Sequence, residues 1–62
     1  MLYKTTREII IEQGRKMLVI PADSEIYKIP NDHMKDNRNF NHYNWNGEII
    51  AIEKDSNSVR KV

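Results

Sequence analysis

Short apolar runs separated by turn residues make up most of this 62-residue chain. These runs are rich in Ile and Val, whose β-branched side chains lose rotamer freedom in a helix and pack well on a pleated sheet. The clearest runs are residues 4–12, 15–20, 25–29 and 48–53. The pattern predicts a mostly β fold: a small antiparallel sheet, or a compact barrel, of four or five strands.

Gln13-Gly14 predicts a hairpin between the first two runs, because Gly supplies the positive φ of a two-residue turn. With these two residues at its centre, the turn places Glu12 opposite Arg15 and Ile10 opposite Met17.

Asn46-Gly47 is a stronger hairpin signal, and it places Trp45 opposite Glu48 and Tyr43 opposite Ile50. Residues 40–45 then form a strand, with Tyr43 and Trp45 on one face and residues 40, 42 and 44 on the other.

The first run also fits a helix. Thr5 followed three residues later by Glu8 matches a capping box, and Gly14 suits the end of a helix. The alternative fold is therefore α+β, with an N-terminal helix over about residues 5–13 packed on a three-stranded sheet.

We expect residues 1–62 to form a single small domain, with residues 31–44 as a long polar and aromatic connection and residues 55–62 as a frayed tail. So short a domain buries roughly 60% of the surface its unfolded chain exposes, which makes its stability marginal. The chain has no Cys, so no disulfide can stabilise its fold. We therefore expect a homo-oligomer.

Ten Lys and Arg against nine Asp and Glu give a formal net charge of +1. Strongly basic nucleic-acid binders carry a much larger excess of positive charge than this.

The start lacks the apolar segment of a signal peptide, and no apolar run approaches the ~20 residues of a membrane span. We expect a cytoplasmic protein with no membrane partner. The richness in Ile, Asn and Lys suggests an AT-rich bacterial or phage genome, so the expected compartment is the cytoplasm of a bacterial host.

The sequence contains no motif for catalysis or cofactor binding. Ser24, Ser56 and Ser58 lie in no nucleophile motif, and the two glycines form no phosphate loop. Polar side chains with loose metal-ligand spacing are better explained as solvated loop residues: Asp32, His33, Asp36 and His42. We expect no enzyme activity, no metal and no cofactor.

Aromatic and basic residues gather in one polar segment, and they are the candidate partner-binding residues. Trp, Tyr and Arg dominate protein interfaces, whereas stacked aromatics with basic neighbours also bind single-stranded nucleic acid. A net charge near zero favours a protein partner. The alternative is that the aromatic rings belong to the core. The candidates are Lys35, Arg38, Phe40, His42, Tyr43 and Trp45.

Arg7, Arg15 and Lys16 could form a second, basic surface beside the first hairpin turn. The string from Ile11 to Arg15, continued by Val19-Ile20-Pro21, resembles the AbrB/MazE family of swapped-hairpin DNA-binding proteins. The resemblance implies an intertwined homodimer that grips DNA with Arg7 and Arg15. The chain has one more residue between Gly-Arg and Ile-Pro than that family, and turn residues where the family has a short helix.

The sequence thus predicts a small non-enzymatic binding module. Its size and composition suit a phage or mobile-element accessory protein that binds and modulates or inhibits a host protein. The alternatives are a dimeric DNA-binding regulator with a basic β-hairpin and, third, an assembly component.

Overall fold

The structure is a computed structural model that describes residues 1–30 and 39–62, and the described residues form seven strands and no helix. No helix long and apolar enough to cross a membrane is found among them. The strands are β1 (Leu2–Thr5), β2 (Ile9–Gln13), β3 (Lys16–Ile20), β4 (Glu25–Ile29), β5 (Phe40–Trp45), β6 (Glu48–Glu53) and β7 (Val59–Lys61).

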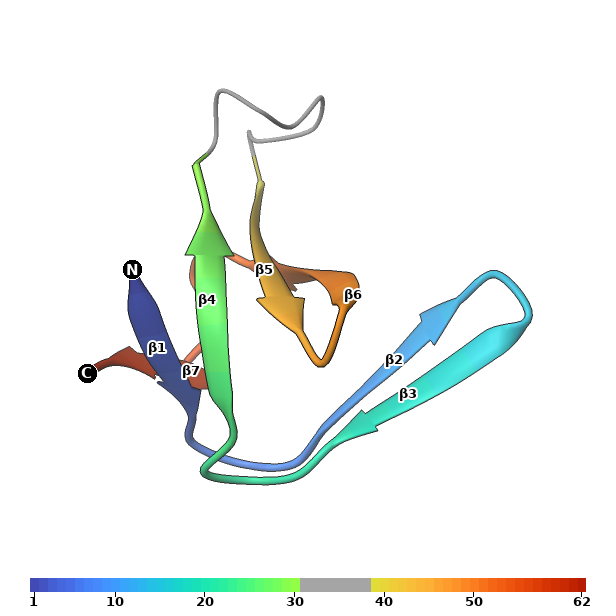
Figure 1. Cartoon of the computed structure of the whole chain (residues 1–62), viewed down its shortest axis with the longest axis horizontal. Coiled ribbons are helices and arrows are strands. Elements are labelled where there is room, and N and C mark those ends of the chain that lie inside the picture. The colour runs from blue at the N-terminus through green and yellow to red at the C-terminus, as the bar shows by residue number, and fades with distance from the viewer. Residues whose placement is uncertain (31–38) are drawn as a thin grey trace.

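The strands form two antiparallel sheets (Figure 1). One has five strands in the order β6-β5-β4-β1-β7, and the other is the β2–β3 hairpin. The mostly β prediction is confirmed. The barrel prediction is wrong because the larger sheet is open, with β6 and β7 at its edges. The helical alternative is also wrong, since residues 5–13 contain the end of β1 and all of β2.

The β5–β6 hairpin has the predicted register. Trp45 pairs with Glu48 and Tyr43 with Ile50. Asn46 has φ 52° and Gly47 has φ 81°, and two successive positive φ angles define a type I′ turn. The right-handed twist of this turn matches that of the strands, so Asn-Gly fixes the pairing.

The β2–β3 hairpin forms with a different register from the predicted one. Its turn residues are Gly14 and Arg15, and Gln13 pairs with Lys16. Gly14, with φ 64°, occupies the first central position, where a type II′ turn needs glycine. Compared with the predicted register, each residue of β2 pairs with a residue two positions farther along β3, so Ile10 lies opposite Val19 instead of Met17. A shift of two leaves every side chain on its predicted face.

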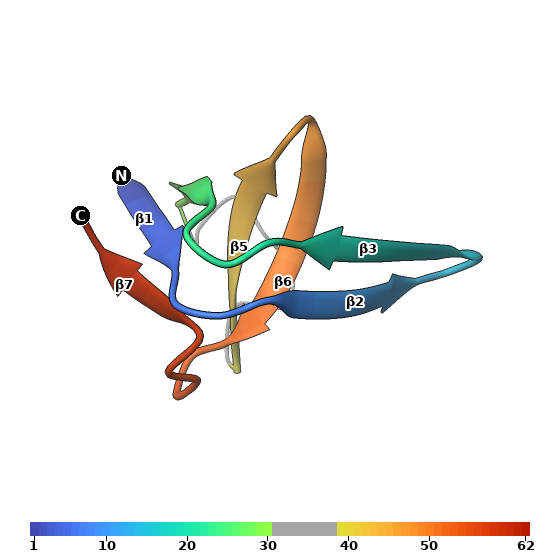
Figure 2. The same cartoon turned by 90° about the horizontal axis from the view of Figure 1, so that it is seen from below.

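The first apolar run is interrupted, and the C-terminal segment contains a short strand. Residues 6–8 separate β1 from β2, so the predicted strand over residues 4–12 is two strands in different sheets. β7 lies within the predicted tail and pairs with β1, where Tyr3 faces Lys61 and Thr5 faces Val59. The two chain ends lie next to each other in Figures 1 and 2.

The core lies between the larger sheet and the hairpin. In Figure 2 the hairpin passes across β5 and β6, and Figure 1 shows it on the lower side of these strands. Apolar residues of β2 and β3 pack there against the facing side of the sheet. The buried hydrophobic residues of the described chain are Ile20, Ile26, Tyr43, Ile50 and Ile52.

Two contacts join the tip of the hairpin to the start of β6. Gln13 Nε2 donates a hydrogen bond to the carbonyl oxygen of Ile49 at 3.1 Å. Lys16 Nζ lies 3.0 Å from Glu48 Oε1 in an exposed ion pair, which in water contributes ~1 kcal/mol or less. The hairpin is therefore positioned mainly by its packed side chains.

Candidate functional site

One face of the larger sheet carries its core residues, and the opposite face carries the residues between them. β2 borders this opposite face at β5 and β6, where Ile11, Glu12 and Gln13 line a hollow together with His42, Ile49 and Ala51. Side chains alternate between the faces of a strand, so residues next to the core residues point to the opposite side. We call this opposite side the outer face. Its central residues are Leu2, Tyr27, Ile29, Phe40, His42 and Ile49.

Strand register brings these residues together although they are far apart in the sequence. Ile49 faces Asn44, Asn44 faces Tyr27, and Tyr27 faces Leu2, which makes one transverse row over four strands. A second row runs from Ala51 through His42 to Ile29.

Large apolar side chains on the outer face are open to solvent. Tyr27 is 56% exposed and Ile49 is 46% exposed, while Leu2, Ile29 and Phe40 are partly buried. An antiparallel sheet with one solvated face normally alternates apolar and polar residues, with the polar ones facing water. The outer face of this sheet instead mixes large apolar side chains with polar ones, including the exposed Asn44 between Tyr27 and Ile49. This exposed apolar area makes the outer face a candidate interaction site.

The outer face ends in charged residues at one side. Lys4 lies opposite Glu25 on β4 and opposite Arg60 on β7. This row forms a charged border beside the apolar side chains of the outer face.

The predicted partner-binding residues divide between the two faces. Phe40 and His42 lie on the outer face, and both are partly buried. Trp45 is also partly buried but packs against the core. Lys35 and Arg38 lie outside the described residues.

Tyr43 is a core residue, which corrects its prediction as a partner contact. It is 1% exposed, and its ring meets that of Tyr3 edge to face at a centroid distance of 5.6 Å. Burial raises the pKa of the Tyr43 phenol above its usual value, although a hydrogen bond with the side chain of Asn41 opposes the shift. The ring is thus unavailable to a partner in the folded state.

His42 carries an unused hydrogen-bonding atom. Its Nδ1 is buried and has no hydrogen-bond partner among the described residues. A neutral imidazole can donate from one nitrogen and accept at the other, so this atom is a hydrogen-bonding group that the described residues leave unused.

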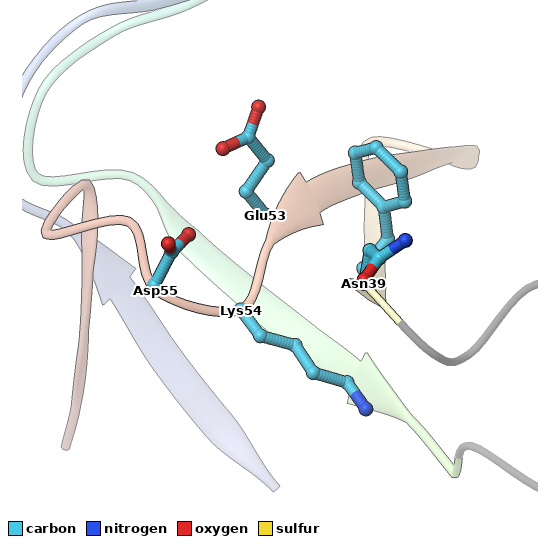
Figure 3. A pocket seen from close by; sticks show the side chains of 5 residues that line it. Asn39, Glu53, Lys54 and Asp55 are labelled. Atoms are coloured by element: carbon cyan, nitrogen blue, oxygen red, sulfur yellow. The ribbon is translucent and has the colours of Figure 1, made fainter.

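A separate hollow lies beside the end of β6. It is lined by Asn39, Phe40, Glu53, Lys54 and Asp55 (Figure 3). The Lys54 side chain extends away from the carboxylates of Glu53 and Asp55. Across residues 1–30 and 39–62, no group of three or more His, Cys, Asp or Glu side chains is placed to hold a metal ion.

The basic residues of the alternative prediction do not form one patch. Arg15 lies in the exposed β2–β3 turn, whereas Arg7 lies before β2 and donates a hydrogen bond from Nε to Ser58 Oγ at 3.0 Å. All of β2, whose five residues extend over roughly 16 Å, lies between them. Lys16, beside Arg15, is engaged by Glu48.

The serine hydroxyls make structural hydrogen bonds. Ser24 Oγ donates to the Pro21 carbonyl oxygen at 2.6 Å, and Ser56 Oγ lies 2.7 Å from Ser58 Oγ. Ser58 is 5% exposed. Both contacts lie within loops, between β3 and β4 and between β6 and β7.

The sequence interpretation missed Leu2, Tyr27, Ile29 and Ile49 as surface candidates. The signal was present in β4 and β6, where neighbouring residues such as Ile26 and Tyr27, or Ile49 and Ile50, are both apolar. Such a strand has apolar side chains on both faces.

No family model matches this chain, and no curated protein or solved structure matches it either. After β3 the chain turns through residues 21–24 into β4, where the resemblance to swapped-hairpin proteins would require a helix.

Proposed function

We propose that this chain is a small non-enzymatic binding module whose outer face docks on a protein partner. The observation that supports this most is the apolar outer face, because a solvated sheet face of this size is ordinarily polar. A phage or mobile-element accessory protein that occupies and modulates a host protein suits the short chain and its composition.

The chemistry of the outer face agrees with a protein partner. Tyr27 offers a large ring with a polar hydroxyl, the type of side chain that anchors interfaces. Leu2 and Ile29 lie beside it, and Ile49 lies farther along the same row, beyond Asn44. The Lys4–Glu25–Arg60 row gives charges of both signs at one side. A surface for nucleic acid would instead concentrate positive charge.

Site-specific photo-crosslinking tests this proposal. A benzophenone amino acid is placed at Tyr27 on the outer face or, as the control, at Met17, which is 61% exposed on the hairpin. Each variant is exposed to a nuclease-treated bacterial lysate. We expect one reproducible protein adduct at Tyr27 that is absent at Met17 and is lost when Ile49→Lys is added. Equal adducts at both positions, or adducts with nucleic acid in untreated lysate alone, would contradict the proposal.

The DNA-binding alternative retains one supporting observation, the exposed Arg15 in the turn of a hairpin that extends from the sheet. Binding that neutralises phosphates weakens with salt, with a log–log slope of about −0.9 per contact on duplex DNA. Titration of the protein with duplex DNA from low to high salt checks this. Tight, salt-sensitive binding that is lost in Arg15→Ala but kept in Tyr27→Ala would favour the alternative.

A further inference from the structure

The free edge of β6 presents backbone groups that the larger sheet does not use. Gln13 donates its hydrogen bond to the Ile49 carbonyl, so this carbonyl points away from β5. Backbone groups of an antiparallel strand alternate in direction, so Ala51 and Glu53 point to the same free edge. The Lys54 N–H instead bonds to Asn39 O at 3.0 Å, as this alternation requires.

A cleft runs between this edge and the hairpin. One hollow of about 310 Å³ includes Ile9, Ile52 and Glu53 in its lining, and another of about 420 Å³ includes Gln13 and Ile49. Both are lined by Ile11 and Ala51, so they are continuous along β2 and β6. Each volume is at the low end of ordinary ligand pockets.

We propose that this cleft accepts an extended peptide segment of another protein, which adds as a strand to the free edge of β6. The proposal goes beyond the outer-face interface, because it concerns the edge of the sheet and a different mode of recognition. In strand addition, main-chain hydrogen bonds give affinity and alternate side chains give specificity.

The Gln13 side chain shows what chemistry the edge accepts. Its carboxamide N–H meets the Ile49 carbonyl at 3.1 Å, where the amide of an added strand would lie. The amide and carbonyl groups of Ala51 and Glu53 continue the same row, so a peptide extends along β6 from the point that Gln13 occupies.

Side chains around the cleft define the peptide. Ala51 is small, which leaves room beside it for a large apolar side chain of the peptide on the same face. The next side chain of the peptide would point to the opposite side, where Ile9, Ile11 and Ile52 line the hollow. Glu53 is the charged member of the three free-edge residues and is exposed. A Lys or Arg of the peptide opposite Glu53 would form a favourable cross-strand pair.

A second copy of this chain fits the edge less well. Two β6 strands paired antiparallel about Ala51 would set Ala51 against Ala51 and Ile49 against Glu53. Such pairing leaves the apolar hollow unfilled and places an apolar side chain opposite a charge. The observations therefore favour a peptide over self-pairing.

The probe is a peptide selected on the folded protein from a displayed library of short random sequences, then synthesised. Binding is measured to the natural sequence, to Ala51→Pro and to the matched control Ala51→Thr. Proline removes the N–H of residue 51, which faces away from β5. Edge strands tolerate proline at positions of this kind. We expect Ala51→Pro to weaken binding about tenfold or more, because hydrogen bonds and close approach are both lost, and Ala51→Thr to bind within about threefold of the natural sequence.

A second measurement keeps the proposal testable if Ala51→Pro does not fold. Amide hydrogen exchange of Ala51 and Glu53 is followed with and without the peptide, and we expect both amides to become protected on binding. We also expect Glu53→Lys to weaken a peptide that carries a cation opposite it, and to restore binding when that cation is exchanged for Glu. No selected peptide, unchanged exchange in the bound state, or protection of the Ala51 and Glu53 amides by a second copy of the chain without peptide would overturn the proposal. None of these outcomes bears on crosslinking at Tyr27.

Discussion

Thr5 and Ser24 are joined by two hydrogen bonds that run in opposite directions. The Thr5 N–H donates to the Ser24 carbonyl oxygen at 3.0 Å, and the Ser24 N–H donates to Thr5 Oγ1 at 2.9 Å. Thr5 Oγ1 also donates to the Pro21 carbonyl oxygen at 2.9 Å. The hydroxyl, which is fully buried, thereby holds the end of β1 against the turn that leads from the hairpin into β4.

Thr5→Val should destabilise the protein by about 1–3 kcal/mol. The substitution keeps the shape of the side chain but leaves the Ser24 N–H without its acceptor and removes one of the two hydrogen bonds that the Pro21 carbonyl accepts. Urea denaturation measures the change. Thr5→Ser keeps the hydroxyl and should recover much of the loss, and equal losses in both variants would show that the methyl group matters more than the hydrogen bonds.

Stability should fall at alkaline pH because of Tyr43. Burial raises the pKa of Tyr43 in the folded state, so its contribution is fully present below the unfolded pKa of about 10 and is lost as pH rises through the folded pKa. One coupled proton gives a slope of at most about 1.4 kcal/mol per pH unit. Thermal melts between neutral pH and pH 11 should show a shallower decline in Tyr43→Phe. An identical decline in both proteins would assign the effect to other groups.

Gly47→Ala should destabilise the protein by about 1–2 kcal/mol, the usual cost of left-handed backbone in a residue with a Cβ. Gly47 has φ 81°, and a Cβ built there meets no atom within 4 Å, so the cost is one of backbone conformation and not of a clash. Gly47→Asn is the control, because Asn tolerates this conformation better, and its loss should be smaller. Chemical denaturation compares the three proteins.

The chain should self-associate at tens of micromolar. Few hydrophobic residues are buried among those the structure describes, while Ile10, Met17 and Val19 are 47–61% exposed on the far side of the hairpin. Sedimentation velocity should give a mass above that of one chain, and Val19→Lys should reduce it. A single-chain mass at every concentration would show that the folded monomer is stable without self-association.

The sequence predicted local hairpins better than distant pairings. Asn46-Gly47 determines its register because both residues must adopt positive φ. A single glycine, Gly14, suits either central position of a turn, and this ambiguity produced the wrong register for β2 and β3. β1 and β7 were not predicted as separate strands because each is short and each depends on a partner far along the chain.

Only part of the candidate site could be predicted, because the local pattern fixes which residues share a face but not which face is covered. Alternation placed Phe40 and His42 on the face opposite Tyr43 and Trp45, which agrees with the structure. Which face the hairpin covers depends on how β2 and β3 cross the larger sheet, and no local pattern carries that information. The sequence therefore predicts Tyr43 as a partner contact, although it is buried in the core.

The position of β1 between β4 and β7 has a consequence for how the chain folds. β5 and β6 are joined by a two-residue turn and can pair within microseconds. β1 must wait for partners that follow it in the chain by about 20 residues in β4 and by more than 50 in β7. Contacts of such sequence separation slow folding because the entropy of closing the loop is lost before the contact forms. We expect the sheet to grow from the β5–β6 hairpin and to close last where the two chain ends meet.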